Sequence, residues 1–199
     1  MELLIYILLI LTSVVGLTFI IERGLALRWA KVLPPSIEAA VRSCGSAEEV
    51  GMLQKVCRDN PSPLGRILDL AGSHLDWPKA EAVDAIQTQA RHEVVKLERG
   101  LVVLEIIVGI APLLGLVGTI VGMMSLFGGL GETGLSDTAA LAKGIGLILN
   151  ATLMGLLIAI PCLVFWSYYN KKVEVMAVEM ETLCDEFLRR QYRGASSGS

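Results

Sequence analysis

The stretch that decides the fold is residues 111–124, "APLLGLVGTIVGMM". It has the hydrophobicity of a membrane-spanning helix, yet it contains one proline, three glycines and a single hydroxyl, that of Thr119. Contact with lipid requires none of these residue types. Small residues and hydroxyls in spanning helices usually serve contacts with other helices. We therefore expect this helix to pack against protein over much of its surface.

Two further apolar runs indicate a membrane protein. The chain of 199 residues is 53% hydrophobic, with a mean hydropathy of +0.61. Residues 3–21, about 101–127 and about 144–168 are each long enough to cross a bilayer, which takes roughly 20 apolar residues. The first run has no basic stretch before it and no small-residue cleavage site after it, so we interpret it as a retained span. We predict an all-α membrane protein with three transmembrane helices.

The basic residues predict the orientation of the three spans. Residues 22–100 hold 11 of the 17 lysines and arginines, and the segment after residue 170 holds five. Loops rich in these residues stay inside, which predicts an N-terminus outside the membrane, residues 22–100 inside, residues 129–142 outside and the C-terminus inside. The small net charge of −3 gives no indication of a nucleic-acid partner.

Apolar stripes predict that two spans extend into a cytoplasmic helical bundle. Residues 83–104 and 173–187 carry apolar side chains at alternating spacings of three and four, as in a coiled coil. Ser36, Ser46 and Pro78 are expected near the starts of further helices. The predicted parts are transmembrane helix 1 (1–22), a cytoplasmic helical domain (23–100), transmembrane helix 2 (101–128), a short periplasmic loop (129–142), transmembrane helix 3 (143–169), a cytoplasmic C-terminal helix (170–193) and a flexible tail (194–199). The four cysteines lack metal-ligand spacing, and we expect no catalytic centre, cofactor or metal site.

Small residues predict where the second and third spans pack closely. They recur every three or four positions, a pattern that lets helix backbones approach each other. Neighbouring helices of one chain and neighbouring subunits could both supply the contact. The expected packing positions are Gly115, Gly118, Gly122, Ala151, Gly155 and Ala159, together with Pro112 and Pro161.

Four polar side chains are candidates for a proton pathway: Thr119, Thr152, Asn150 and Glu105. Thr119 and Thr152 are equidistant from the centre of the 129–142 connection, so in an antiparallel hairpin they lie at similar depth. Each could instead bond back to a carbonyl of its own helix. Glu105 is an acid within a span, with a structural, gating or proton-carrying role, and Asn150 could bond a neighbouring helix or line a pore.

The segments "LERGLVVLEIIVGIAPLLGLVGTIVGMMSLF" and "GIGLILNATLMGLLIAIPCLVFWSYYNKKVE" resemble the ExbB/TolQ/MotA proton-channel family. The three-span layout favours the ExbB/TolQ branch. The resemblance implies a homopentamer around the single-span helices of a dimeric ExbD/TolR-like partner, whose aspartate carries protons. It also implies that Thr119 and Thr152 line the lumen, and that inward proton flow drives mechanical work at the outer membrane or cell envelope.

One residue departs from the family pattern. Many ExbB and TolQ proteins have a glutamate five residues before the third-span threonine, where this chain has Leu147. This leaves open a second hypothesis, a membrane scaffold that keeps the fold without conducting. A secondary transporter is less favoured, because transporters usually have more spans and internal repeats.

Overall fold

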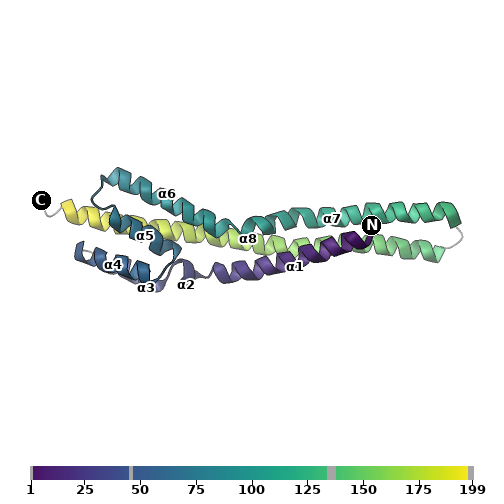
Figure 1. Cartoon of the computed structure of the whole chain (residues 1–199), viewed down its shortest axis with the longest axis horizontal. Helices are drawn as coiled ribbons and strands as arrows, with labels where there is room; N and C mark the ends of the chain where they lie inside the picture. The colour runs from purple at the N-terminus through teal and green to yellow at the C-terminus, as the bar shows by residue number, and fades with distance from the viewer. Residues whose placement is uncertain (1, 45–46, 134–137, 197–199) are drawn as a thin grey trace. The chain divides into compact units, whose positions relative to one another are not determined.

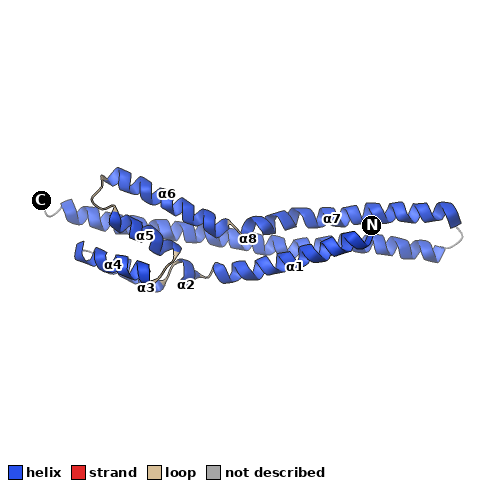
Figure 2. Cartoon of the chain, viewed as in Figure 1, coloured by secondary structure: helices blue, strands red, loops and turns tan. Residues whose placement is uncertain are grey.

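The computed structural model describes residues 2–44, 47–133 and 138–196, with the side chains of residues 2, 47–48, 129–141, 143, 147 and 193–196 left out of the description. Within these ranges every regular element is a helix (Figure 1, Figure 2), so the predicted all-α class is confirmed. The helices are α1 (Glu2–Ala26), α2 (Trp29–Val32), α3 (Pro35–Ser43), α4 (Ala47–Asp59), α5 (Pro63–Ser73), α6 (Lys79–Glu98), α7 (Leu101–Thr133) and α8 (Thr138–Ser196).

Three helices are long and apolar enough to cross a membrane. The candidate spans are Leu3–Ala26 in α1, Leu101–Gly128 in α7 and Gly144–Tyr192 in α8, the last of which extends into the second of the two units described below. Pro112 and Pro161 lie inside continuous helices, α7 and α8 respectively. Only about a third of the most apolar window of α7 is buried within the chain. The rest of its apolar surface is left for lipid or for other protein chains.

The helices around residues 129–142 are longer than the sequence indicates. The structure continues α7 to Thr133 and begins α8 at Thr138, so both ends of the expected loop have helical backbone. No proline lies between Pro112 and Pro161, and glycine alone costs a helix only about 1 kcal/mol. The predicted start at Ser46 lies outside the described residues, and the short helix α2 is not foreseen by the periodicity.

The first of two compact units contains residues 1–23 and 100–168. A side chain at Gly118 would meet both Ile5 of α1 and Ala151 of α8, and one at Gly16 would meet Ile107 of α7 and Cys162 of α8. Between these two levels each helix advances by eleven residues. Helices α1 and α8 therefore run parallel to each other, and α7 runs antiparallel to both.

The second unit contains residues 24–99 and 169–199 and has its own hydrophobic core. The predicted stripe on the C-terminal part of α8 is buried, with at most 2% of each side chain exposed: Val173, Met176, Met180, Leu183 and Phe187. All of these except Val173 belong to this core. Around this stripe lie apolar side chains of α3, α4 and α5. Ser62 caps α5 by accepting a hydrogen bond from the Gly65 amide at 3.0 Å.

Three cysteines lie in this second core as free thiols. Burial raises the pKa of the Cys57 thiol to about 11. Because the thiolate is the reactive form, these thiols are suited to packing and not to redox chemistry.

A buried carboxylate joins α5 to α6. Glu93 has no exposed side-chain surface and accepts hydrogen bonds from Arg66 at 2.5 Å, Lys96 at 2.8 Å and Gln89 at 3.1 Å. Burial alone would raise the pKa of Glu93, but the hydrogen bonds and charges of Arg66 and Lys96 together outweigh it and lower the pKa below its usual value. Arg66 holds this carboxylate from the neighbouring helix and so fixes α6 against α5.

We predict that Glu93→Gln destabilises the second unit by about 1–2 kcal/mol at neutral pH, because charge-assisted hydrogen bonds become neutral ones. The lowered pKa of Glu93 stabilises the fold at pH values above about 4.3, the pKa of a glutamate in the unfolded chain. This contribution disappears as the pH falls through the pKa that Glu93 has in the folded chain. The melting difference between wild type and variant should therefore shrink below about pH 4. Loss of helical circular dichroism during heating measures it, because this signal does not require a reactive thiolate at low pH. The control is Glu81→Gln, which changes an exposed acid at the start of α6. A melting difference between wild type and Glu93→Gln that does not depend on pH would contradict an ionised Glu93 in the folded chain.

Candidate functional site

In the first unit, called the membrane unit below because it holds most of the candidate spans, α7 and α8 approach each other closely at two glycines. A Cβ atom at Gly155 would lie 2.6 Å from the Ala111 carbonyl oxygen and 3.2 Å from the Gly115 Cα. A Cβ atom at Gly115 would lie 2.9 Å from the Ala151 carbonyl oxygen. Both obstacles are backbone atoms, which cannot rotate away. These glycines therefore pack neighbouring helices of the same chain, one of the two possibilities that the sequence leaves open.

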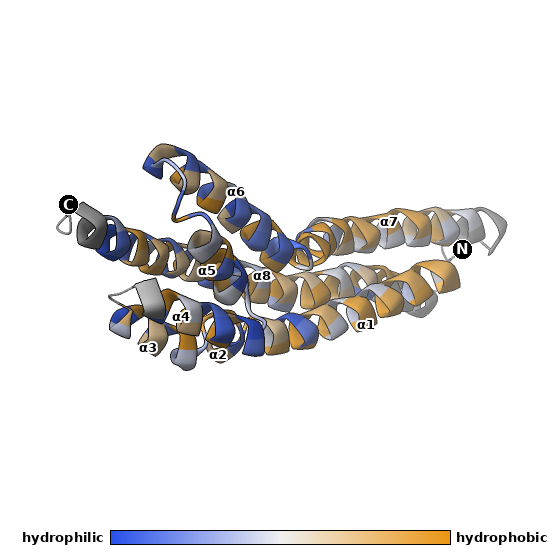
Figure 3. Ribbon diagram, turned by 60° about the vertical axis from the view of Figure 1, so that its left-hand side comes forward, coloured by the Kyte–Doolittle hydropathy of each residue, from blue (hydrophilic) through white to orange (hydrophobic). Residues whose placement is uncertain are grey.

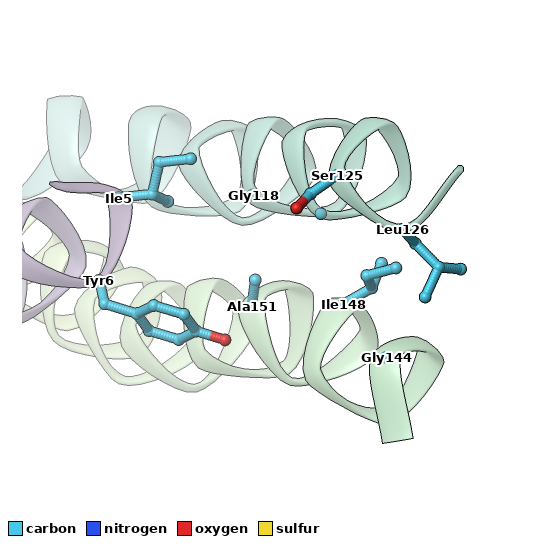
Figure 4. A pocket seen from close by; sticks show the side chains of 9 residues that line it. Ile5, Tyr6, Gly118, Ser125, Leu126, Gly144, Ile148 and Ala151 are labelled. Carbon is cyan, nitrogen blue, oxygen red and sulfur yellow. The ribbon is translucent and has the colours of Figure 1, made fainter. Parts of the chain in front are cut away.

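Toward the C-terminal end of α7 and the N-terminal end of α8, the glycines pack against side chains instead of backbone. Cβ atoms at Gly118 and Gly122 would lie 2.7 Å from Ala151 Cβ and 2.6 Å from Ile148 Cγ1. Beside this row is a cavity of about 160 Å³ between α1, α7 and α8. Figure 4 shows Tyr6 of α1 and Ser125 of α7 at its wall, two residues that the pattern of small residues does not reveal.

Thr119 and Thr152 occupy matching positions on the two helices. Each follows a residue of the contact between α7 and α8, since Gly118 faces Ala151. The pairing of Gly118 with Ala151 and of Gly122 with Ile148 puts the two threonines within about 3 Å of the same depth, at 1.5 Å per residue. In an antiparallel pair, the residue after a facing residue turns to the same side on both helices. The two half-buried threonines thus share one flank of the hairpin.

The two hydroxyls have different hydrogen bonds. Thr119 Oγ1 donates to the Leu116 carbonyl at 2.7 Å, which is bonding back to its own helix. The structure gives Thr152 Oγ1 no partner among the described residues. The Thr119 hydroxyl would have to break its hydrogen bond to the Leu116 carbonyl before it could donate to another group. The Thr152 hydroxyl is available to donate.

Glu105 belongs to the flank of Thr119, but Asn150 does not belong to that of Thr152. Residues 105, 112 and 119 are seven apart, which keeps them within about 40° on a helix. Glu105 is exposed, without an ion pair among the described residues. Asn150 is two residues from Thr152, which puts it about 160° away around α8. The two-residue separation already indicates that Asn150 and Thr152 lie on different sides of α8, although the sequence predicts both as candidates for one pathway.

The remaining predicted positions are consistent with a packed hairpin. Ala151 and Ala159 are buried, Pro112 is half-buried and Pro161 is exposed. The side chain of Leu147 lies outside the described residues. Among the side chains that the structure describes, no group of His, Cys, Asp and Glu is placed to hold a metal.

Residues 62–182 match the MotA/TolQ/ExbB proton channel family. This chain belongs to that family. The match covers more than half of the chain and includes the whole hairpin with both threonines. The contact between α7 and α8 therefore lies in the part of the chain that matches a proton channel family, which the packing alone does not indicate.

Named relatives lie in the ExbB/TolQ branch. The chain is 31% identical over 147 residues to a putative biopolymer transport protein ExbB homolog of Methanothermobacter thermautotrophicus, covering 73% of this chain and 51% of that protein. It is 28% identical over 193 residues to the Tol-Pal system protein TolQ of Pseudomonas aeruginosa, covering 90% and 82%. It is 31% identical over 105 residues to the biopolymer transport protein ExbB of Helicobacter pylori, covering 53% and 68%. The chain thus spans about half the length of the Methanothermobacter protein and most of the Pseudomonas one.

We predict that Gly155→Ala separates α7 from α8, because the new methyl group would meet backbone atoms. The loss should be about 1–3 kcal/mol, the usual cost of overpacking. Gly146→Ala is the matched control on the same helix, since a Cβ atom there meets nothing within 4 Å. Thermal stability in detergent, followed by thiol exposure of Cys162, compares the two. Equal stability of both variants would show that the backbones are not in contact at this level.

Proposed function

We propose that this chain is the channel and stator subunit of a motor driven by the proton-motive force. With an ExbD/TolR-like single-span partner, it couples inward proton flow to mechanical work at the outer membrane or cell envelope. The observation that carries the proposal is the pair of hydroxyls at matched depth on one flank of a glycine-packed hairpin. Membership in a proton channel family and the names of the ExbB and TolQ relatives support it.

The proposed assembly is a homopentamer in the bacterial inner membrane, with a periplasmic N-terminus and a cytoplasmic C-terminus. Repeating the flank of Thr119 and Thr152 around an axis produces a ring of hydroxyls at one depth. The large apolar surface that a single chain leaves exposed on α7 and α8 supports further protein contacts. A dimeric partner inside the ring would meet these hydroxyls.

The chemistry of this ring follows from the cost of a buried charge. A partner aspartate in a low-dielectric pore has a raised pKa and stays protonated. A threonine hydroxyl that donates to the ionised form lowers that cost at one position only. Thr152 has its donor available for this purpose, while Thr119 must first exchange its bond to the Leu116 carbonyl. Five copies cannot match two partner helices equally, which favours motion in steps.

Glu105 and Asn150 have separate proposed roles. Glu105 shares the flank of Thr119 and lies only five residues into α7, which suits a gating or proton-releasing acid near the inner surface. Asn150 faces away from that flank and suits a hydrogen bond to a neighbouring helix. Leu147 in place of the family glutamate supports the second candidate function, a non-conducting scaffold of the same fold.

We predict that Thr119→Val and Thr152→Val each lower partner-dependent proton flux by tenfold or more, because the hydroxyl is lost with little change of volume. Proteoliposomes that contain the chain and its partner, with a pH-sensitive dye inside, measure the flux. Thr119→Ser and Thr152→Ser should keep most of it.

The control for these variants is Thr18→Val, an exposed α1 threonine that bonds back to the Val14 carbonyl. Its flux should match wild type. Full flux in both pore variants would reject the hydroxyl ring. A wild-type complex that binds its partner without any flux would favour the scaffold instead.

A further inference from the structure

The segment directly after the first membrane span has one buried and one exposed side. Leu27, Val32 and Leu33 are at most 1% exposed, and the latter two pack into the core of the second unit. Arg28, Trp29 and Lys31 are all exposed, with 41% of the tryptophan accessible. The chain therefore places a large aromatic ring and two cations together outside its own core.

Neither cation is neutralised within the described part of the chain. Arg28 and Lys31 have no ion pair there, whereas Arg58, Arg189 and Arg190 each pair with a carboxylate. No acidic residue occurs between Glu22 and Glu38. Trp77, also exposed, packs against His74 with a centroid distance of 4.0 Å, while no described ring contacts Trp29. This surface has the composition of a binding site without an occupant from the same chain.

The depth of this surface follows from chain connectivity. The candidate span ends at Ala26, and α2 begins at Trp29, only three residues later. Figure 3 shows hydrophobic residues along α1 giving way to hydrophilic ones toward α2. Tryptophan next to a span occupies the headgroup layer, and basic residues there attract anionic lipid. The segment lies outside the residues that match the family.

We propose that Arg28, Trp29 and Lys31 bind the headgroup of anionic glycerophospholipids. The two cations contact the phosphate and its negative neighbours, and the indole ring rests at the boundary between headgroup and acyl chain. The site fixes the depth at which α1 leaves the membrane. It requires membrane insertion of α1 and does not require proton conduction, so it can hold or fail independently of the proposed channel.

Quenching of Trp29 by brominated lipids tests the site. The full-length chain with Trp77→Phe and Trp166→Phe retains Trp29 as its single tryptophan. It is reconstituted in phosphatidylcholine vesicles that contain an equal fraction of brominated phosphatidylglycerol or brominated phosphatidylcholine. We expect stronger quenching by the anionic lipid, and this preference should fall as salt screens the charges.

Removing the cations should remove the preference. Each cation near an anionic surface contributes about fivefold to lipid affinity, so Arg28→Gln with Lys31→Gln should lower the relative affinity at least tenfold. Lys55→Gln with Arg91→Gln is the control, because it removes two exposed cations that belong to other helices, α4 and α6. Arg28→Lys with Lys31→Arg should keep the preference.

Three results would overturn the proposal. One is equal quenching by both lipids in the wild-type background. Another is a preference that survives the Arg28 and Lys31 double substitution or high salt. The third is an equal loss in the Lys55 and Arg91 control, which would indicate attraction to overall charge instead of a site. The salt series needs no charge variant, so the proposal stays testable if the double substitution fails to fold.

Discussion

The contact between backbones at Gly115 and Gly155 is the constraint on which the rest of the membrane unit depends. A Cβ atom at Gly155 would lie 2.6 Å from a carbonyl oxygen, so only glycine allows this separation of α7 and α8. In lipid, an apolar side chain gains little free energy when it moves from contact with lipid to contact with protein, because both are apolar. Close van der Waals packing therefore drives the association of helices. The same contact fixes the register of the hairpin, because a shift by one residue would bring a side chain against backbone.

That register turns two separate threonines into one feature. Thr119 and Thr152 both border the row of contacts, and antiparallel geometry brings them to one side at similar depth. A looser hairpin would leave their relative depth free to vary, and a hydroxyl ring needs the depth to be constant in every copy. In the proposed function the glycines therefore act through position, although none of them carries a group that could bind a proton.

Sequence periodicity predicts most of the fold because apolar spacing records which side of a helix is buried. The stripe from Val173 to Phe187 is one case, and the similar depth of the two threonines is another, since both follow from regular helix geometry. The contribution of α1 could not be predicted in this way. Nearly every residue of α1 is apolar, so its sequence does not distinguish Ile5, which packs on Gly118, from lipid-facing neighbours. The sequence also did not predict where α7 ends and α8 begins, because glycines near residue 130 suggest a loop but do not prevent a helix.

The two units differ in how their polar side chains are satisfied within the chain. In the second unit, the buried acid Glu93 has three donors around it and contributes to a fixed fold. In the membrane unit, the hydroxyl of Thr152 and the carboxylate of Glu105 have no partner among the described residues. A polar group at membrane depth without a partner is costly, so its cost has to be offset by something outside the single chain. In the proposed channel, other copies of the chain, a partner helix or water in the pore would satisfy this condition.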